Sequence, residues 1–301
     1  MPSADASPTP AAASAPGSAT LWEALSPFPR RRDWLALRRE FEDRIASTFP
    51  DWIAPDQPHF RDQRAFAVGR FDEGANLARY FLETPPASAR DGRLDVLDLG
   101  AGNGGVALAL ANCPGHRVRA LDVVPDHNLI RLRRSIGLPV DAVVGEGGAL
   151  PYASESFDAV LLLDVLEHAA SARRLGREVM RVLRPGGVCM ITTPPRLRYV
   201  FARDPHWGIP ALTLLPNFVQ RLIVNRLARR RILGHAGSAA DAFDVAHIYW
   251  HVAEIARLFP EPRRVEALFN RMLDPSSPSR RERWHYRFRN FFWDRILIYK
   301  I

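Results

Sequence analysis

The residues with the clearest chemical pattern lie in the segment Val96-Leu-Asp-Leu-Gly-Ala-Gly-Asn-Gly-Gly105. Glycines at positions 100, 102 and 104 let the backbone adopt positive φ angles and approach a ligand closely. A helix that starts just beyond them offers free N–H groups and the positive end of its dipole. Asp122 stands 22 residues after Gly100, at the end of the next predicted strand, where a carboxylate can accept hydrogen bonds from both hydroxyls of a ribose. The pattern therefore indicates a site for a ligand that contains a ribose.

The glycine loop by itself leaves two classes of cofactor open. Gly100, Gly102 and Gly105 also satisfy the G-x-G-x-x-G pattern of dinucleotide-binding proteins. A nicotinamide enzyme and an S-adenosylmethionine enzyme are therefore both compatible with the turn, and later segments of the chain have to discriminate between them.

Three later segments do so. They are Gly145-Glu-Gly-Gly-Ala-Leu-Pro-Tyr152, the run from Phe157 to His168, and Leu183-Arg-Pro-Gly-Gly-Val ahead of Cys-Met-Ile-Thr-Thr-Pro-Pro195. In this order they closely resemble the class I (seven-stranded, Rossmann-like) S-adenosylmethionine-dependent methyltransferases, of the branch that includes quinone, sterol and sugar methyltransferases. The resemblance covers about residues 94–195, is weaker for 245–301, and is absent from 1–60 and 196–240.

The resemblance implies which residues bind the cofactor: Asp98, Gly100, Ala101, Gly102, Asp122, Val123, Glu146, Gly147, Leu163 and Asp164. Asp98 and the glycine loop would hold the methionine end, Asp122 the ribose, and Val123 the adenine. Glu146 stands where the family usually carries an Asp that hydrogen-bonds the adenine amino group, so the acceptor atom is kept on a longer arm. Leu163 and Asp164 would line the space between cofactor and acceptor.

His168 is the motif residue nearest to the chemistry. Sulfonium methyl transfer is an in-line displacement that needs mainly alignment and a dry pocket. A base is required only when the nucleophile is a hydroxyl that must lose its proton. His168 is the predicted base. The alternative is that this histidine has a structural role, at the start of a helix and buried against the sheet. The spacing Asp164-x-x-Glu167-His168 also resembles the metal-assisted coenzyme Q O-methyltransferases, but it departs from them by an Asp for a Glu, and no metal is predicted.

Acceptor choice is expected to reside in residues 196–245, an insertion after the fifth predicted strand, where the family places its lid. Arg203 could clamp a phosphate or carboxylate, while His206 and Trp207 could stack on a sugar or ring. The alternative is a solvated basic face with Trp207 in a core. The expected acceptor is a small anionic or lipid-linked molecule (a glycan, quinone or polyprenyl compound), methylated on oxygen.

Charge is distributed unevenly along the chain. The protein has 41 basic and 33 acidic residues and a net charge of +8, and the stretch from Arg196 to the end holds 19 of the bases but only 9 of the acids. Such asymmetry indicates an anionic substrate, a membrane surface or nucleic acid. The helix expected at 218–233 and the aromatic–basic stretch 283–293 could both lie on an anionic bilayer. Nucleic acid is disfavoured, because no RNA-binding module or Asn/Asp-Pro-Pro-Tyr motif is seen.

The elements that must position these residues alternate in type after a helical stretch at 21–85. Strands are expected at 94–99, 117–121, 140–144, 158–163, 187–193, 264–269 and 295–300, and helices at 104–112, 126–136, 171–183, 218–233 and 251–259. Strand–helix alternation favours a parallel sheet covered on both faces. The resemblance implies a doubly wound, mostly parallel seven-stranded α/β sheet with an antiparallel last strand. The expected organisation is a disordered tail (1–20), an N-terminal helical cap (21–90) and a methyltransferase domain (91–301).

Composition limits the remaining function classes. The 301 residues are 47% hydrophobic and 25% charged, which excludes a fibrous or wholly disordered protein. Cys113 and Cys189 sit among apolar residues and favour a reducing, cytoplasmic setting, with peripheral contact at the inner face of the membrane as an added expectation. Two alternatives stay open: a nicotinamide-dependent dehydrogenase that shares the glycine loop, and a non-catalytic cofactor-binding adaptor at a membrane.

Overall fold

The computed structural model describes the chain in separate ranges between residues 18 and 301. The described residues are 18–45, 58–123, 133–134, 136–194, 209, 211–216, 218–220, 222–223, 226, 251–261, 263–268 and 295–301. The expected tail up to residue 17, most of the helix predicted at 126–136 and most of the insertion 196–245 lie outside these residues. Among the described residues, no helix combines the length and the apolar character that crossing a bilayer would require.

Seven strands form one sheet in the order β3-β2-β1-β4-β5-β7-β6. Their bounds are β1 Leu94–Leu99, β2 His116–Asp122, β3 Val140–Val144, β4 Phe157–Leu163, β5 Leu183–Thr192, β6 Arg263–Leu268 and β7 Arg295–Lys300. The first five strands pair in parallel, and β7 is antiparallel to both β5 and β6. The prediction of a mostly parallel seven-stranded sheet with an antiparallel last strand is confirmed.

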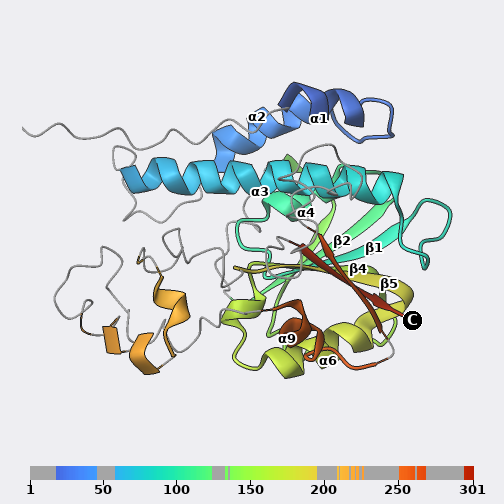
Figure 1. Ribbon diagram of the computed structural model, residues 1–301. Coiled ribbons are helices and arrows are strands. Elements are labelled where there is room, and N and C mark those ends of the chain that lie inside the picture. The colour runs from blue at the N-terminus through green and yellow to red at the C-terminus, as the bar shows by residue number, and fades with distance from the viewer. Residues whose placement is uncertain are drawn as a thin grey trace, which may run out of the picture.

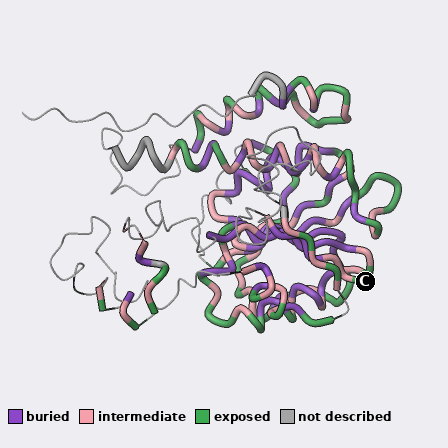
Figure 2. Tube along the Cα trace, viewed as in Figure 1, coloured by how far each residue is buried: buried purple, intermediate pink, exposed green. Residues whose placement is uncertain are grey.

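Helices cover both faces of the sheet (Figure 1). On one face lie α1 (Ser18–Leu25), α2 (Trp34–Ile45), α3 (Pro58–Glu83) and α4 (Gly105–Ala111), and on the other lie α6 (Ala172–Val182) and α9 (Val252–Ala256). The side chains of successive strand residues pack on opposite faces of the sheet. Val96 belongs to the core under α3 and α4, while Leu97 belongs to the core under α6 and α9. All seven residues of β4 are buried, as expected for a central strand covered twice. Figure 2 shows this buried band between the two helical layers.

The long helix α3 packs so closely against α4 that the backbones of the two helices are in contact. A Cβ atom added to Gly74 of α3 would lie 2.7 Å from the Cα of Val106, and one added to Gly105 of α4 would lie 2.8 Å from the backbone nitrogen of Phe71. Side chains at these two positions would push the helices apart. The two glycines therefore hold α3 directly over the start of α4, where the glycine loop ends.

Two boundaries differ from the prediction in an informative way. Strand β5 begins at Leu183 rather than 187, because Leu183 already pairs with Phe157 and the register shifts before Ala159 pairs with Val188. Gly186 lies within this strand at a φ of 78°. The strand therefore continues through Arg184-Pro-Gly-Gly as an irregularity. Helix α9 is also shorter than the predicted 251–259; the His251 side chain accepts from the Ala253 N–H and Glu254 completes a capping box.

Candidate functional site

The glycine loop adopts the backbone geometry that the sequence predicts. Gly100, Gly102 and Gly104 have φ angles of 76°, 52° and 81°. A Cβ atom on Gly100 would lie 2.3 Å from the Cγ2 atom of Val165, so both conformation and space require glycine there. Asp122 accepts a hydrogen bond from the N–H of Gly102 at 2.9 Å through its Oδ2 atom. The carboxylate thereby fixes the middle of the loop and is itself held at the end of β2.

The loop's N–H groups are used within the protein, which corrects one expectation. The N–H groups of Gly100 and Ala101 donate to the carbonyl of Leu121, at 2.7 and 3.2 Å, and that of Gly104 donates to Ala101 at 2.8 Å. The N–H of Gly105 donates to the Oδ1 atom of Asn103 at 3.0 Å. Helix α4 has only seven residues. Of the N–H groups expected to be free at its start, that of Gly105 is therefore already engaged.

One cavity, of about 510 Å³, lies beside the ends of β2 and β3, and we call it the β3 cavity. Its lining includes four residues predicted to hold the ribose and adenine: Asp122, Val123, Glu146 and Gly147. Val123 is 62% exposed and presents an apolar face to this space. The structure thus brings together the predicted adenosine-side residues at the carboxyl ends of adjacent parallel strands.

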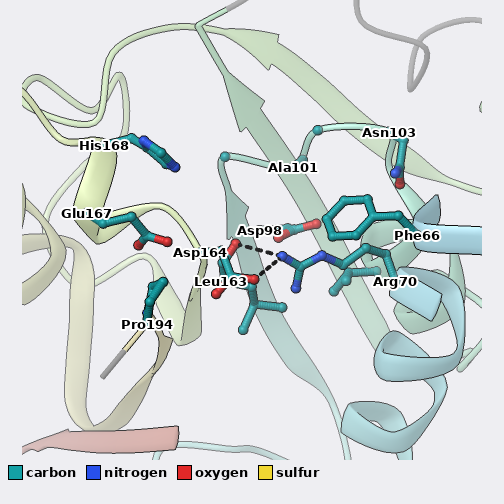
Figure 3. Close-up of a pocket in the computed structure, with 13 residues that line it drawn as sticks. Phe66, Arg70, Asp98, Ala101, Asn103, Leu163, Asp164, Glu167, His168 and Pro194 are labelled. Carbon is teal, nitrogen blue, oxygen red and sulfur yellow. Dashed lines mark hydrogen bonds and ion pairs between the residues drawn. The ribbon is translucent and has the colours of Figure 1, made fainter. Parts of the chain in front are cut away.

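A second cavity, of about 440 Å³, lies between the glycine loop and α3, and we call it the α3 cavity. Figure 3 shows its lining residues. They include seven residues named from the sequence: Asp98, Gly100, Ala101, Gly102, Leu163, Asp164 and His168. The two cavities share Gly100 and His168. A ligand lying along the loop could therefore extend from one cavity into the other.

Helix α3 contributes two residues to this cavity that the sequence analysis did not identify, Phe66 and Arg70. The Arg70 side chain is 14% exposed and forms an ion pair with Asp164 and another with Glu73, the latter at 2.7 Å. Its Nη2 atom also lies 3.5 Å from the carbonyl oxygen of Leu163. The Phe66 ring, 56% exposed, lies 5.0 Å from the guanidinium of Arg70. A positive charge from the N-terminal helices is thus held against the methionine side of the predicted site.

Two buried carboxyl groups face the same space, as Figure 3 shows. Burial raises the pKa of Asp98 to about 7, although the nearby Arg70 charge acts to lower it. Burial likewise raises the pKa of Glu167 to about 7. Asp98 is 2% exposed and Glu167 1% exposed. Within the described part of the chain, the Asp98 Oδ2 and Glu167 Oε2 atoms have no hydrogen-bond partner. Such orphaned acceptors are costly, and they mark where a ligand could donate.

Asp164 follows β4 in a left-handed conformation, with a φ of 56°. Aspartate tolerates this region better than most residues. Its N–H donates to the carbonyl of Thr192 at 2.9 Å, and the Thr192 hydroxyl donates to its Oδ1 atom at 3.2 Å. The ion pair with Arg70 adds a contact from α3. Asp164 therefore joins β4, β5 and the N-terminal helices at the rim of the α3 cavity.

His168 ends a short 3-10 helix, Leu166–His168, and is exposed. The alternative of a histidine buried against the sheet is therefore wrong. Its place in the lining of both cavities is compatible with a role in proton transfer. The predicted acceptor residues Arg203, His206 and Trp207 lie outside the described residues. Within the described ranges, no group of three or more His, Cys, Asp or Glu side chains is arranged to hold a metal ion.

Comparison with known proteins agrees with this geometry. Residues 97–191 match the family model described as "Methyltransferase domain". These residues form a class I S-adenosylmethionine-dependent methyltransferase domain.

Phe66 and Arg70 lie outside this methyltransferase domain match, and the resemblance of motifs gave no reason to choose them. The available signal was Gly74 inside a helical pattern, since a glycine there often marks close packing.

Two curated relatives show how far the similarity extends. The chain is 36% identical over 103 residues to a glycine/sarcosine/dimethylglycine N-methyltransferase of Actinopolyspora halophila, covering 33% of this chain and 18% of that one. It is 34% identical over 123 residues to the ubiquinone/menaquinone biosynthesis C-methyltransferase UbiE of Desulfotalea psychrophila, covering 39% and 50%. The match thus spans at most half the length of these relatives. A solved methyltransferase from Aquifex aeolicus is similar at 20% identity and a TM-score of 0.35, covering 44% and 70%.

Proposed function

We propose that this chain transfers a methyl group from S-adenosylmethionine to an oxygen atom of a small anionic or lipid-linked acceptor, such as a glycan, quinone or polyprenyl compound. The observation that carries the proposal is the meeting of two cavities at Gly100 and His168. One presents Asp122, the carboxylate predicted to bind the ribose, and the other presents buried carboxyl groups at the end where the methyl group would be transferred.

The residues present fit the cofactor at both ends. Asp122 is fixed by the N–H of Gly102 and could accept from the ribose hydroxyls. At the other end, the orphaned Oδ2 atom of Asp98 is suited to the ammonium group of the methionine moiety, because a buried carboxylate is stabilised by a paired cation. S-adenosylmethionine would supply a methyl group already activated on a sulfonium, so the protein need not activate it further.

The chain's own residues would align the acceptor, exclude water and take up a proton. Leu163 and Pro194 give the α3 cavity an apolar wall, which favours a desolvated reaction. His168 stays the predicted proton acceptor, and the buried Glu167 carboxyl offers a second one in the same cavity. A group that removes a proton is needed for a hydroxyl nucleophile, and this supports oxygen as the methylated atom.

Calorimetric titration with S-adenosylhomocysteine tests the cofactor part of the proposal. We expect binding of this compound, no binding of NAD, and a loss of affinity of about tenfold or more in Asp122→Ala, because hydrogen bonds to a charged acceptor contribute about 1.5–3 kcal/mol. Asp141→Ala is the matched control, since Asp141 is an exposed aspartate on the neighbouring strand β3. Failure of the folded wild-type protein to bind S-adenosylhomocysteine would overturn the proposal.

The acceptor part has its own measurement. Release of S-adenosylhomocysteine would be followed with hydroxyl-bearing lipid-linked glycans and quinols, and with amines as the comparison. Turnover confined to amines would contradict methylation on oxygen. Peripheral contact with an anionic membrane stays a prediction, because most of the basic residues on which it depends lie outside the described part of the chain.

A further inference from the structure

We propose that Arg70 of helix α3 binds the carboxylate of the cofactor's methionine moiety, so that the N-terminal helices form part of the cofactor site. This inference rests on the proposed use of S-adenosylmethionine. It assigns a binding role to a residue that lies outside the matched methyltransferase domain, 27 positions before its start at residue 97.

The methionine moiety carries two charges that the α3 cavity must balance. Its ammonium group can pair with Asp98, but its carboxylate needs a donor of opposite charge, since an unpaired buried charge is costly. Among the described residues that line this cavity, Arg70 is the only arginine or lysine. The charge requirement of the ligand therefore points to this side chain.

The glycine loop offers little alternative. Five of its backbone N–H groups already donate within the protein, at distances of 2.7 to 3.2 Å: those of Gly100, Ala101, Gly102, Gly104 and Gly105. A carboxylate placed in the α3 cavity would have to break one of these bonds to use any of these five donors, which leaves only the N–H of Asn103 among the loop residues 100–105. A guanidinium avoids this cost and can bind a carboxylate with two parallel hydrogen bonds.

Arg70 has capacity for a further partner. A guanidinium has five N–H donors, and the contacts with Glu73, Asp164 and the Leu163 carbonyl use three acceptors. Glu73 would keep Arg70 in place on its own helix while the head group engages the ligand. Asp164 retains the Thr192 hydroxyl if Arg70 turns away from it. The exchange therefore leaves no charged group without a partner among these residues.

The position of Arg70 is also restrained before any ligand arrives. The ring of Phe66, one helical turn earlier, lies 5.0 Å from the guanidinium, and the contact of α3 with α4 at Gly74 and Gly105 sets the height of the helix above the loop. A side chain held in this way loses less conformational entropy when it binds. Figure 3 shows Arg70 reaching across toward Asp164, with Asp98 beside it.

The test compares two ligands that differ at the methionine end. S-adenosylhomocysteine has the carboxylate and the ammonium, whereas 5′-methylthioadenosine has neither and keeps the ribose and adenine. In Arg70→Met we expect affinity for S-adenosylhomocysteine to fall at least tenfold and affinity for 5′-methylthioadenosine to change less than twofold. Arg79→Met is the matched control, because Arg79 is on the same helix and pairs only locally with Glu83 among the contacts seen.

The outcomes separate this inference from the proposed function. If the wild-type protein binds neither compound, the proposed function fails. If it binds both, and Arg70→Met weakens both equally or neither, then Arg70 is not the carboxylate ligand. Should Arg70→Met not fold, Arg70→Lys gives the answer: it keeps the charge but loses the paired hydrogen bonds, so the affinity ratio of the two compounds must still fall. An unchanged ratio would overturn the inference.

Discussion

Asp98 and Glu167 are carboxylic acids that the fold buries at the wall of one cavity. Each has a pKa raised to about 7, chiefly by burial, so each holds a proton over a range in which an exposed carboxyl has lost it. Asp98 receives only partial compensation, from Arg70 and from the N–H of Ala107. The arrival of an ammonium group beside it would favour the ionised form and drive the proton off.

Cofactor binding should therefore depend on pH through Asp98. Below pH 7 the free protein must release a proton to bind, so we expect the affinity for S-adenosylhomocysteine to rise about tenfold per pH unit up to about pH 7 and to level off above it. Titrations in buffers of different ionisation enthalpy measure the proton released. Asp98→Asn should flatten the profile and Glu167→Gln should not. A slope that survives in Asp98→Asn would contradict this assignment.

Prediction from sequence succeeds at this scale where a motif residue acts through its own loop. Asp122, Glu146, Gly100 and Gly102 line the two cavities because the strand ends and their order along the chain place them there. Arg70 and Phe66 could not be predicted in the same way. They reach the site only because one helix crosses another at a particular height, and that crossing depends on contacts between residues far apart in the sequence.

At the scale of the elements, the packing of α3 on α4 decides how the N-terminal helices meet the loop. We expect Gly74→Ala to lower the free energy of unfolding by about 1–3 kcal/mol, because its new methyl group would meet the backbone of Val106. Gly69→Ala is the matched control on the same helix, since nothing lies within 4 Å of an added Cβ there. It should stabilise the protein by about 1 kcal/mol through helix propensity.

Chemical denaturation of the two variants gives both numbers. If α3 does position Arg70, Gly74→Ala should also weaken binding of S-adenosylhomocysteine more than binding of 5′-methylthioadenosine. Equal stability of the two alanine variants would contradict the close contact between the helices. The sequence predicted helical structure at 21–85 and a helix at 104–112, but periodicity reports burial and not the packing partner, so the contact between α3 and α4 could not be predicted.

At the scale of the whole molecule, the two buried carboxyls contribute to the pH dependence of folding. Their folded-state pKa of about 7 lies above the ordinary values of 3.8 for an aspartate and 4.5 for a glutamate. Between about pH 4 and pH 7 the folded state therefore holds protons that the unfolded state has lost, so the free energy of unfolding falls as the pH rises through this window. The contribution is on the order of 3 kcal/mol per carboxyl and is fully lost above pH 7.

Urea denaturation from pH 4.5 to 8 measures this contribution. The variant carrying both Asp98→Asn and Glu167→Gln should lose less stability than the wild type as the pH rises, because neither amide titrates. Glu83→Gln, which alters an exposed residue of α3 paired with Arg79, is the control and should follow the wild-type curve. Parallel profiles for the double variant and the wild type would show that the two carboxyls do not titrate in this range.

The order of strands at the far side of the sheet has a consequence for synthesis of the chain. Strand β7 follows β6 in sequence but lies between β5 and β6, so β6 has no neighbour in the sheet until residues 295–300 have been made. Throughout that interval the edge of β5, with the apolar residues Val188, Cys189, Met190 and Ile191, is open to pairing with other chains. During synthesis the edge of β5 therefore stays unpaired and prone to aggregation until β7 pairs with it. We expect a nascent chain that is arrested before residue 295 to bind chaperones.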